Sequence, residues 1–215
     1  PFYYIIRADE GKSDSPAPEI VNNMDKFLVT DYNFWGAYDI WKDLYVGVFR
    51  ANQVLDNVPG IAMEETMKQR ILGEAKFLRG LFYYNLAILW GNVPLMLKTS
   101  QPQDLPPTST EAEVWAQIEK DLSEAALSLP LSYGSADLGR ATKGAANALL
   151  AKALMQQHKY TEALIPLEWL VEGEGSNVYD LMPDYRDNFL VTSENNMESV
   201  FEWQFELNPS ENHDD

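Results

Sequence analysis

Two short stretches ahead of the first predicted helix carry residue types that recognise sugar rings. A sugar ring presents flat C–H faces edged by hydroxyl groups, so a sugar-binding surface combines exposed Trp or Tyr rings with Asp, Asn and Arg side chains. The chain is 12% aromatic, and most of its rings recur at helical spacing and are expected in the core, which leaves those outside helices as candidates. We predict these ligand-binding residues, with simple packing as the alternative for each: Tyr3, Tyr4, Arg7, Asp9, Tyr32, Asn33, Phe34 and Trp35.

No group of residues indicates catalysis. The two histidines, His158 and His213, lie in different regions without the spacing of a zinc protease, and the chain has no cysteine to act as nucleophile or metal ligand. Gly173 and Gly175 do not begin a dinucleotide-binding loop, because Val178 occupies the third glycine position and no predicted strand precedes them. We therefore expect no enzymatic activity, no cofactor and no metal site.

The acidic residues leave one class of enzyme open as an alternative. Glycoside hydrolases place two carboxyl groups about 5 to 9 Å apart across the bond that they cleave. The chain has 33 Asp and Glu residues, enough for two of them to face a cleft, but a sequence does not give their separation. An all-α glycoside hydrolase would release reducing ends from a polysaccharide.

The net charge limits the partners. The formal charge is -17 at pH 7, so the phosphate backbone of a nucleic acid and an anionic bilayer surface would both be repelled. We expect no nucleic-acid partner and no direct attraction to a membrane.

The candidate residues must be positioned by a core, and the stretch 70–100 predicts its centre. From Phe77 to Trp90 the sequence is apolar on nearly every face, which is typical of a helix surrounded by other helices. The run is shorter than the roughly 20 apolar residues of a membrane span and contains Arg79. The turn 91–94, with Gly91 and Pro94, should end this helix.

Four further helices are predicted around this one. Apolar residues recur every three or four positions over 35–58, and again from Trp115 to Leu129 after a capping box at Thr110 and Glu113. The stretch 141–157 is rich in alanine, and Gly144 begins a ridge of small residues that lets another helix approach. The last helix starts near Thr161.

The last two predicted helices resemble a tetratricopeptide unit, with Ala151, Tyr160 and Ala163 at its small and turn positions. Asn147 replaces the usual Trp, and Pro166 should kink the second helix or shorten its first turn. The predicted fold class is therefore mainly α, with tetratricopeptide-like stacked helical hairpins and a minor β and loop portion near the C-terminal end.

The predicted domain organisation is a single partial domain over 1–215. Its helical scaffold occupies 35–171, and the stretch 172–215 should contain loops and a strand that lead into a missing C-terminal half. The strand is predicted from Ser199 onward to Leu207, where apolar and polar residues alternate.

Several of these stretches resemble the SusD/RagB family of nutrient-binding outer-membrane lipoproteins. The similar segments extend from about Asp39 to Phe205, and include Asn195, Asn196 and Glu198 before the predicted strand. The first predicted helix is similar at Trp41, Tyr45, Ala51, Asn52 and Leu55. The residues that match the family's central signature are Glu74, Phe77, Leu78, Arg79, Tyr83, Tyr84, Leu86, Gly91, Val93, Pro94 and Leu95.

The resemblance implies a tetratricopeptide-like scaffold and a role in polysaccharide utilisation. It implies a surface-exposed lipoprotein of the outer membrane that binds an oligosaccharide or polysaccharide for nutrient uptake and delivers it to a SusC-like TonB-dependent transporter. It also implies a protein roughly twice this long, held to the membrane only by a lipid anchor that these residues lack. The family's glycan contacts vary, so none is carried over to this chain.

A tetratricopeptide-type adaptor is the other alternative. Such a protein would bind a peptide in the concave groove of its helical stack and would have no secretion signal.

Overall fold

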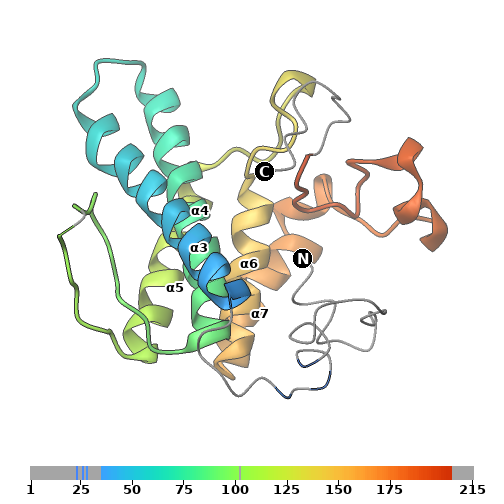
Figure 1. The fold of residues 1–215 in the computed structure, drawn as a ribbon. Coiled ribbons are helices and arrows are strands. Elements are labelled where there is room, and N and C mark those ends of the chain that lie inside the picture. The colour runs from blue at the N-terminus through green and yellow to red at the C-terminus, as the bar shows by residue number, and fades with distance from the viewer. Residues whose placement is uncertain (1–22, 24–25, 27, 29–34, 102, 205–215) are drawn as a thin grey trace, which may run out of the picture. The chain divides into compact units, whose positions relative to one another are not determined.

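The computed structural model describes residues 23, 26, 28, 35–101 and 103–204 (Figure 1). The chain separates into two compact units, 1–43 and 44–215, with the boundary inside the first described helix. The second unit contains nearly all of the described residues, and the contacts below lie within it. Aromatic and β-branched residues favour an extended segment over 1–7, and Gly, Ser, Pro and Asp favour a loop over 8–19, but both lie outside the described residues.

Five helices follow one another along the described chain, as the sequence predicts. The helices are α3 (Trp35–Asn57), α4 (Glu65–Trp90), α5 (Glu111–Ser128), α6 (Lys143–Gln156) and α7 (Tyr160–Val171). The helix α4 begins well before the apolar stretch from Phe77 that predicts it, whereas the other four helices begin and end within two residues of their predictions where one was made. Short 3-10 turns connect or follow the helices. The 3-10 turns are η1 (Val58–Gly60), η2 (Ser135–Asp137), η3 (Glu174–Asn177), η4 (Tyr185–Phe189) and η5 (Val191–Ser193).

Local sequence signals explain where α4 and α5 begin and end. The predicted capping box is confirmed, since the Thr110 hydroxyl accepts from the Glu113 amide at 3.3 Å and the Glu113 carboxylate accepts from the Thr110 amide at 2.8 Å. Glu64 caps α4 in a similar way, and two backbone amides lower the pKa of its carboxyl. Gly91 ends α4 at φ +68°, a conformation that favours glycine.

The helix α4 is the centre of the core, as predicted. Phe77, Tyr83 and Leu86 are almost fully buried, and α5 packs along α4, α6 along α5 and α7 along α6 (Figure 1). The close approach of α5 depends on Gly80, where a Cβ atom would lie 3.0 Å from the Leu122 side chain. No helix in the described part of the chain is long and apolar enough to cross a membrane.

The tetratricopeptide-like pairing of α6 and α7 is also present. Ala151 and Ala163 are both 1% exposed, as the repeat pattern requires. The helix α7 starts at Tyr160 and continues through Pro166, so the proline does not shorten its first turn, and the expected kink stays a prediction. At Gly144 the close neighbour is the ring of Tyr179 from a later loop, rather than a helix.

The predicted strand is wrong over its described part. Residues 199–204 form no strand, and neither does any other described residue. A strand needs a neighbouring strand to pair its backbone amides and carbonyls, and the described segments provide none. The alternating pattern instead reflects one anchoring side chain, because the Phe201 ring packs edge-on against Phe77 with centroids 5.0 Å apart, while Trp203 is exposed.

Candidate functional site

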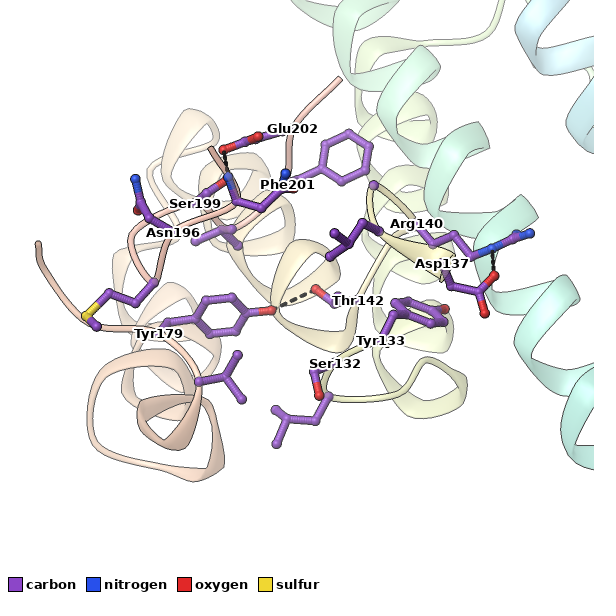
Figure 2. Close-up of a pocket in the computed structure, with 17 residues that line it drawn as sticks. Ser132, Tyr133, Asp137, Arg140, Thr142, Tyr179, Asn196, Ser199, Phe201 and Glu202 are labelled. Atoms are coloured by element: carbon purple, nitrogen blue, oxygen red, sulfur yellow. Dashed lines mark hydrogen bonds and ion pairs between the residues drawn. The ribbon is translucent and has the colours of Figure 1, made fainter. Parts of the chain in front are cut away.

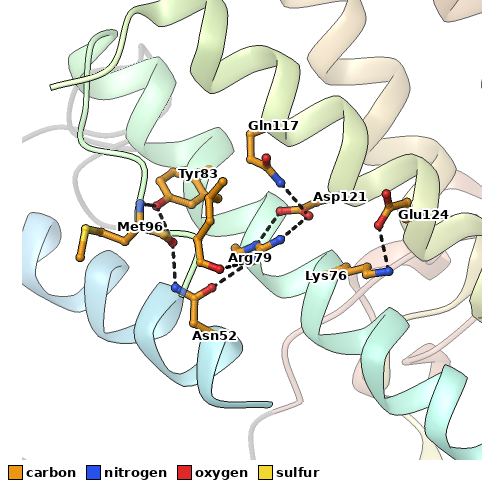
Figure 3. Close-up of polar contacts among 9 residues, drawn as sticks. Asn52, Lys76, Arg79, Tyr83, Met96, Gln117, Asp121 and Glu124 are labelled. Carbon is orange, nitrogen blue, oxygen red and sulfur yellow. Dashed lines mark hydrogen bonds and ion pairs between the residues drawn. The ribbon is translucent and has the colours of Figure 1, made fainter. Parts of the chain in front are cut away.

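A buried ion pair fixes α4 against α5 (Figure 3). Arg79 donates to both carboxylate oxygens of Asp121, through Nε at 2.8 Å and Nη2 at 2.7 Å, and Asp121 is only 1% exposed. The remaining polar atoms are satisfied too, since Arg79 Nη1 donates to Asn52 Oδ1 at 2.9 Å and Gln117 donates to Asp121 at 3.0 Å. Such a closed network holds three helices in one arrangement.

The same network fastens the extended segment after α4 (Figure 3). Asn52 Nδ2 donates to the Met96 carbonyl at 2.7 Å, and the Tyr83 hydroxyl donates to that carbonyl at 3.1 Å and accepts from the Met96 amide at 2.6 Å. The Tyr45 hydroxyl donates to the Pro94 carbonyl at 2.7 Å. Burial raises the pKa of Tyr83 to about 12, so its hydroxyl keeps the proton that it donates. The signature residues therefore build the scaffold rather than a binding surface.

Glu74, another signature residue, connects α4 to the loop 131–142. Its carboxylate accepts from the Tyr133 hydroxyl at 3.0 Å and from Arg140 Nη1 at 3.0 Å, and Arg140 Nε donates to Asp137 at 2.6 Å. Burial, and then the negative charge of Glu74, raise the pKa of Tyr133 well above its ordinary value. The Tyr133 phenol therefore stays neutral at physiological pH and holds the loop against the scaffold.

This loop forms one wall of a pocket of about 350 Å³ (Figure 2). The other walls come from Val178 and Tyr179, which follow η3, and from the segment 195–202. Three aromatic rings line it, from Tyr133, Tyr179 and Phe201. Its size falls in the range of pockets that hold small ligands.

The rings of Phe201 and Tyr179 are each held in place by a helix. Phe201 packs on Phe77 of α4, and the Tyr179 hydroxyl shares a hydrogen bond of 2.8 Å with the Thr142 hydroxyl at the start of α6. The absence of a side chain at Gly144 leaves room for the Tyr179 ring. Burial raises the pKa of Tyr179, so this phenol also stays neutral. The loops therefore form the walls of the pocket, and the helical scaffold fixes the positions of these two rings.

The polar groups around these rings suit a ligand rich in hydroxyl groups. Ser132, Arg140, Asn196, Ser199 and Glu202 offer both donors and acceptors at the pocket wall (Figure 2). Neutral phenol and amide groups form hydrogen bonds with the hydroxyl groups of an uncharged ligand.

Both acidic residues that line the pocket, Asp137 and Glu202, accept hydrogen bonds from neighbouring groups. Asp137 accepts from Arg140 Nε at 2.6 Å. Glu202 accepts from the Asn195 amide at 3.3 Å and from Gln204 at 3.3 Å. No cluster of His, Asp and Glu that would hold a metal occurs among the described residues. The arrangement can bind and orient a ligand.

The structure does not test the binding residues predicted from the sequence. Tyr3, Tyr4, Arg7, Asp9, Tyr32, Asn33 and Phe34 lie outside the described residues, and Trp35 is described only as the first residue of the α3 backbone. Their role in binding stays a prediction.

Sequence reasoning missed the residues of the pocket. Tyr133 and Tyr179 lie outside the predicted helices and strand, and Asn195 and Asn196 carry an expectation only through the family resemblance. The available signal was the same one used for the N-terminal candidates, namely aromatic residues outside helices beside amides and acids. Residues 131–142 and 178–202 carry this signal too.

Known proteins similar to this chain share one family. The sequence profile of a SusD-like family, described as starch-binding and associating with the outer membrane, matches residues 13–155. SusD-like protein P25 of Formosa agariphila is 31% identical over 170 residues, which cover 78% of this chain and 32% of that protein.

Solved structures give the same result. A laminarin-binding SusD-like protein is 28% identical, with a TM-score of 0.81, over 93% of this chain and 48% of that one. Surface glycan-binding protein A of Bacteroides thetaiotaomicron, solved with laminarihexaose, is 28% identical, with a TM-score of 0.66, over 75% of this chain and 34% of that one. The chain spans about a third of the length of the curated relatives that it matches. These names describe binding proteins, which agrees with the expectation that no catalysis takes place.

Proposed function

We propose, because this chain belongs to the SusD-like family of glycan-binding proteins associated with the outer membrane, that its protein binds an oligosaccharide and performs no chemistry on it. The family match over residues 13–155 is the observation that carries the proposal. The pocket supports it, since neutral aromatic rings and hydrogen-bonding side chains around about 350 Å³ are what a sugar requires. The chain would supply the rigid helical part of that protein.

The same proposal includes the location of the protein and the partner that receives its ligand. The protein would lie at the cell surface as a lipoprotein, anchored through an acylated cysteine outside these residues, and would pass its ligand to a SusC-like TonB-dependent transporter. The named glycan-binding relatives support surface capture, and the net charge of -17 agrees with a neutral sugar better than with an anionic ligand.

The binding step is tested on the full-length protein that contains this chain. It would be run in affinity electrophoresis against a panel of neutral polysaccharides, including laminarin and starch, with a reducing-sugar assay on the same samples. Retarded migration without new reducing ends is expected. New reducing ends would identify a hydrolase, and unretarded migration in every polysaccharide would contradict glycan binding.

The sequence-predicted residues have a separate test in the same gels. Trp35→Ala should weaken the retardation if Trp35 stacks on the sugar, while Tyr185→Ala, which removes an exposed ring from the segment after the helices, serves as the control. Unchanged mobility of Trp35→Ala would remove Trp35 from the candidate binding residues without affecting the proposed function.

A further inference from the structure

Two walls of the pocket are joined to each other at the base of one long loop. Tyr179 lies on the wall that follows η3, and the amide of the next residue, Asp180, donates to the Met197 carbonyl at 3.1 Å. Met197 belongs to the other wall, the segment 195–202. Residues 181–194 therefore leave the pocket on one wall and return to it on the other.

Glu198 lies at this junction and bonds to both sides of it. One oxygen of its carboxylate, Oε2, accepts from the Met182 amide at 2.9 Å and from Asn188 Nδ2 at 2.8 Å. The Glu198 amide donates to Asn196 Oδ1 at 2.8 Å, and Asn196 Nδ2 donates to Asn188 Oδ1 at 3.1 Å. Glu198, Asn188 and Asn196 thus close a circuit of hydrogen bonds, and we call these three residues the Glu198 cluster.

The ionised form of Glu198 suits this cluster. The Met182 amide, and then the Asn188 side chain, hold the pKa of the Glu198 carboxyl below its ordinary value. Glu198 is itself absent from the pocket lining, although Met197 and Ser199 on either side of it both line the pocket. Its effect on a ligand would therefore pass through its neighbours.

The rest of the loop has little other support within the described chain. Its turns η4 and η5 pack mainly on each other, and Leu181, Tyr185 and Val191 are 74%, 73% and 83% exposed. A surface loop with few buried contacts opens more readily than the helices that carry it. Since Phe201 anchors one end of the wall 195–202 on α4, the Glu198 cluster is what fixes the other end.

We propose that Glu198 is a positioning residue of the pocket, which holds residues 195–199 in place relative to Tyr179 and so prepares the site for an oligosaccharide. A wall that is already ordered in the free protein loses less freedom when a ligand binds, so the affinity is higher. This inference rests on the proposed function, because it takes the pocket as the glycan site.

The geometry separates positioning from charge. Both bonds to the carboxylate end at the same oxygen, so Glu198→Gln, which keeps one carbonyl oxygen, can retain both of them. Glu198→Ala removes both, and Asn188→Ala opens the cluster from the other side. Glu194→Ala is the matched control, since it removes an exposed acid of the same loop that takes no part in the cluster.

Hydrogen exchange on the full-length, ligand-free protein tests the junction itself. Peptides that cover residues 180–184 should exchange about tenfold or more faster in Glu198→Ala and in Asn188→Ala, because the loop opens more often, while α4 and α5 keep the wild-type rates. Glu198→Gln and Glu194→Ala should resemble wild type. Wild-type exchange in Glu198→Ala would overturn the proposal.

Isothermal titration on the same variants tests the effect on binding. The probe is the hexasaccharide of whichever panel polysaccharide retards the wild-type protein, laminarihexaose in the case of laminarin. Glu198→Ala and Asn188→Ala should bind it about tenfold more weakly through a less favourable entropy, with Glu198→Gln and Glu194→Ala within about twofold of wild type. A role confined to stability would not move the binding entropy.

Two results of the titration would overturn the proposal. One is wild-type affinity in a folded Glu198→Ala protein whose exchange is faster, and the other is a loss in Glu198→Gln equal to that in Glu198→Ala. A wild-type protein that binds no polysaccharide would instead contradict the proposed function, and the exchange rates alone would then decide whether Glu198 fixes the pocket wall.

Discussion

The two ends of the second unit are stabilised in different ways. In the α3–α5 region the polar side chains of the signature residues are buried and paired, and Arg79, Asp121, Asn52 and Tyr83 leave little freedom to the helices that they join. In the segment 180–204 the hydrogen bonds join residues of the segment itself, and large apolar side chains such as Tyr185 and Phe189 are exposed. We infer from the difference that the signature residues maintain a scaffold, and we propose that the ligand-binding groups lie on loops attached to it.

The largest effect should come from the buried ion pair. Asp121→Ala leaves the Arg79 guanidinium buried without its carboxylate, so the free energy of unfolding should fall by about 3–5 kcal/mol. Chemical denaturation would measure it, and Glu124→Ala, which breaks the more exposed pair with Lys76, is the matched control with an expected loss below about 1 kcal/mol. Equal losses in the two variants would contradict a scaffold held by the buried pair.

A second effect concerns high pH. The pKa of Tyr83 in the folded protein is raised from 10.0 to about 12, so its contribution to stability is complete below pH 10 and is lost as the pH rises from 10 through 12. A shift of this size corresponds to about 3 kcal/mol.

Stability measured across this range should fall less steeply in Tyr83→Phe, which has no proton to lose there. Tyr185→Phe removes the hydroxyl of an exposed ring and should keep the steep fall. The same slope in wild type and Tyr83→Phe would show that Tyr83 does not titrate in this way.

The helix cap should have a smaller effect. Thr110→Ala removes the side chain that accepts from the Glu113 amide and should lower the free energy of unfolding by about 1 kcal/mol. Thr110→Ser keeps the hydroxyl and should remain close to wild type in the same denaturation experiment. A loss in the serine variant equal to that in the alanine variant would argue against the cap.

The smallest effect is expected in the segment that follows the helices. Tyr185 is 73% exposed and packs only edge-on against Phe189, with centroids 5.2 Å apart. Tyr185→Ala should therefore change the free energy of unfolding of residues 1–215 by less than about 0.5 kcal/mol. A loss near that of Asp121→Ala would remove the distinction between the two regions.

The helices could be predicted because their signals are local. Apolar spacing, the Thr110 cap and the Gly91 turn each act within a few residues, and all three are confirmed. The partners of the signature residues could not be predicted, because Arg79 meets Asp121 from 42 positions away and Tyr133 meets Glu74 from 59. The pocket was missed for the same reason, since its walls come from three separate segments. The strand was wrong because alternation alone does not show whether a neighbouring strand exists.

We propose that loops attached to the scaffold bind a sugar at the pocket. Isothermal titration of the full-length protein with an oligosaccharide from the polysaccharide that retards it tests this most directly, with Tyr133→Ala compared with Tyr185→Ala. Loss of one stacking ring should weaken binding about tenfold in Tyr133→Ala, with no change in Tyr185→Ala. Wild-type affinity in a folded Tyr133→Ala protein would contradict the claim.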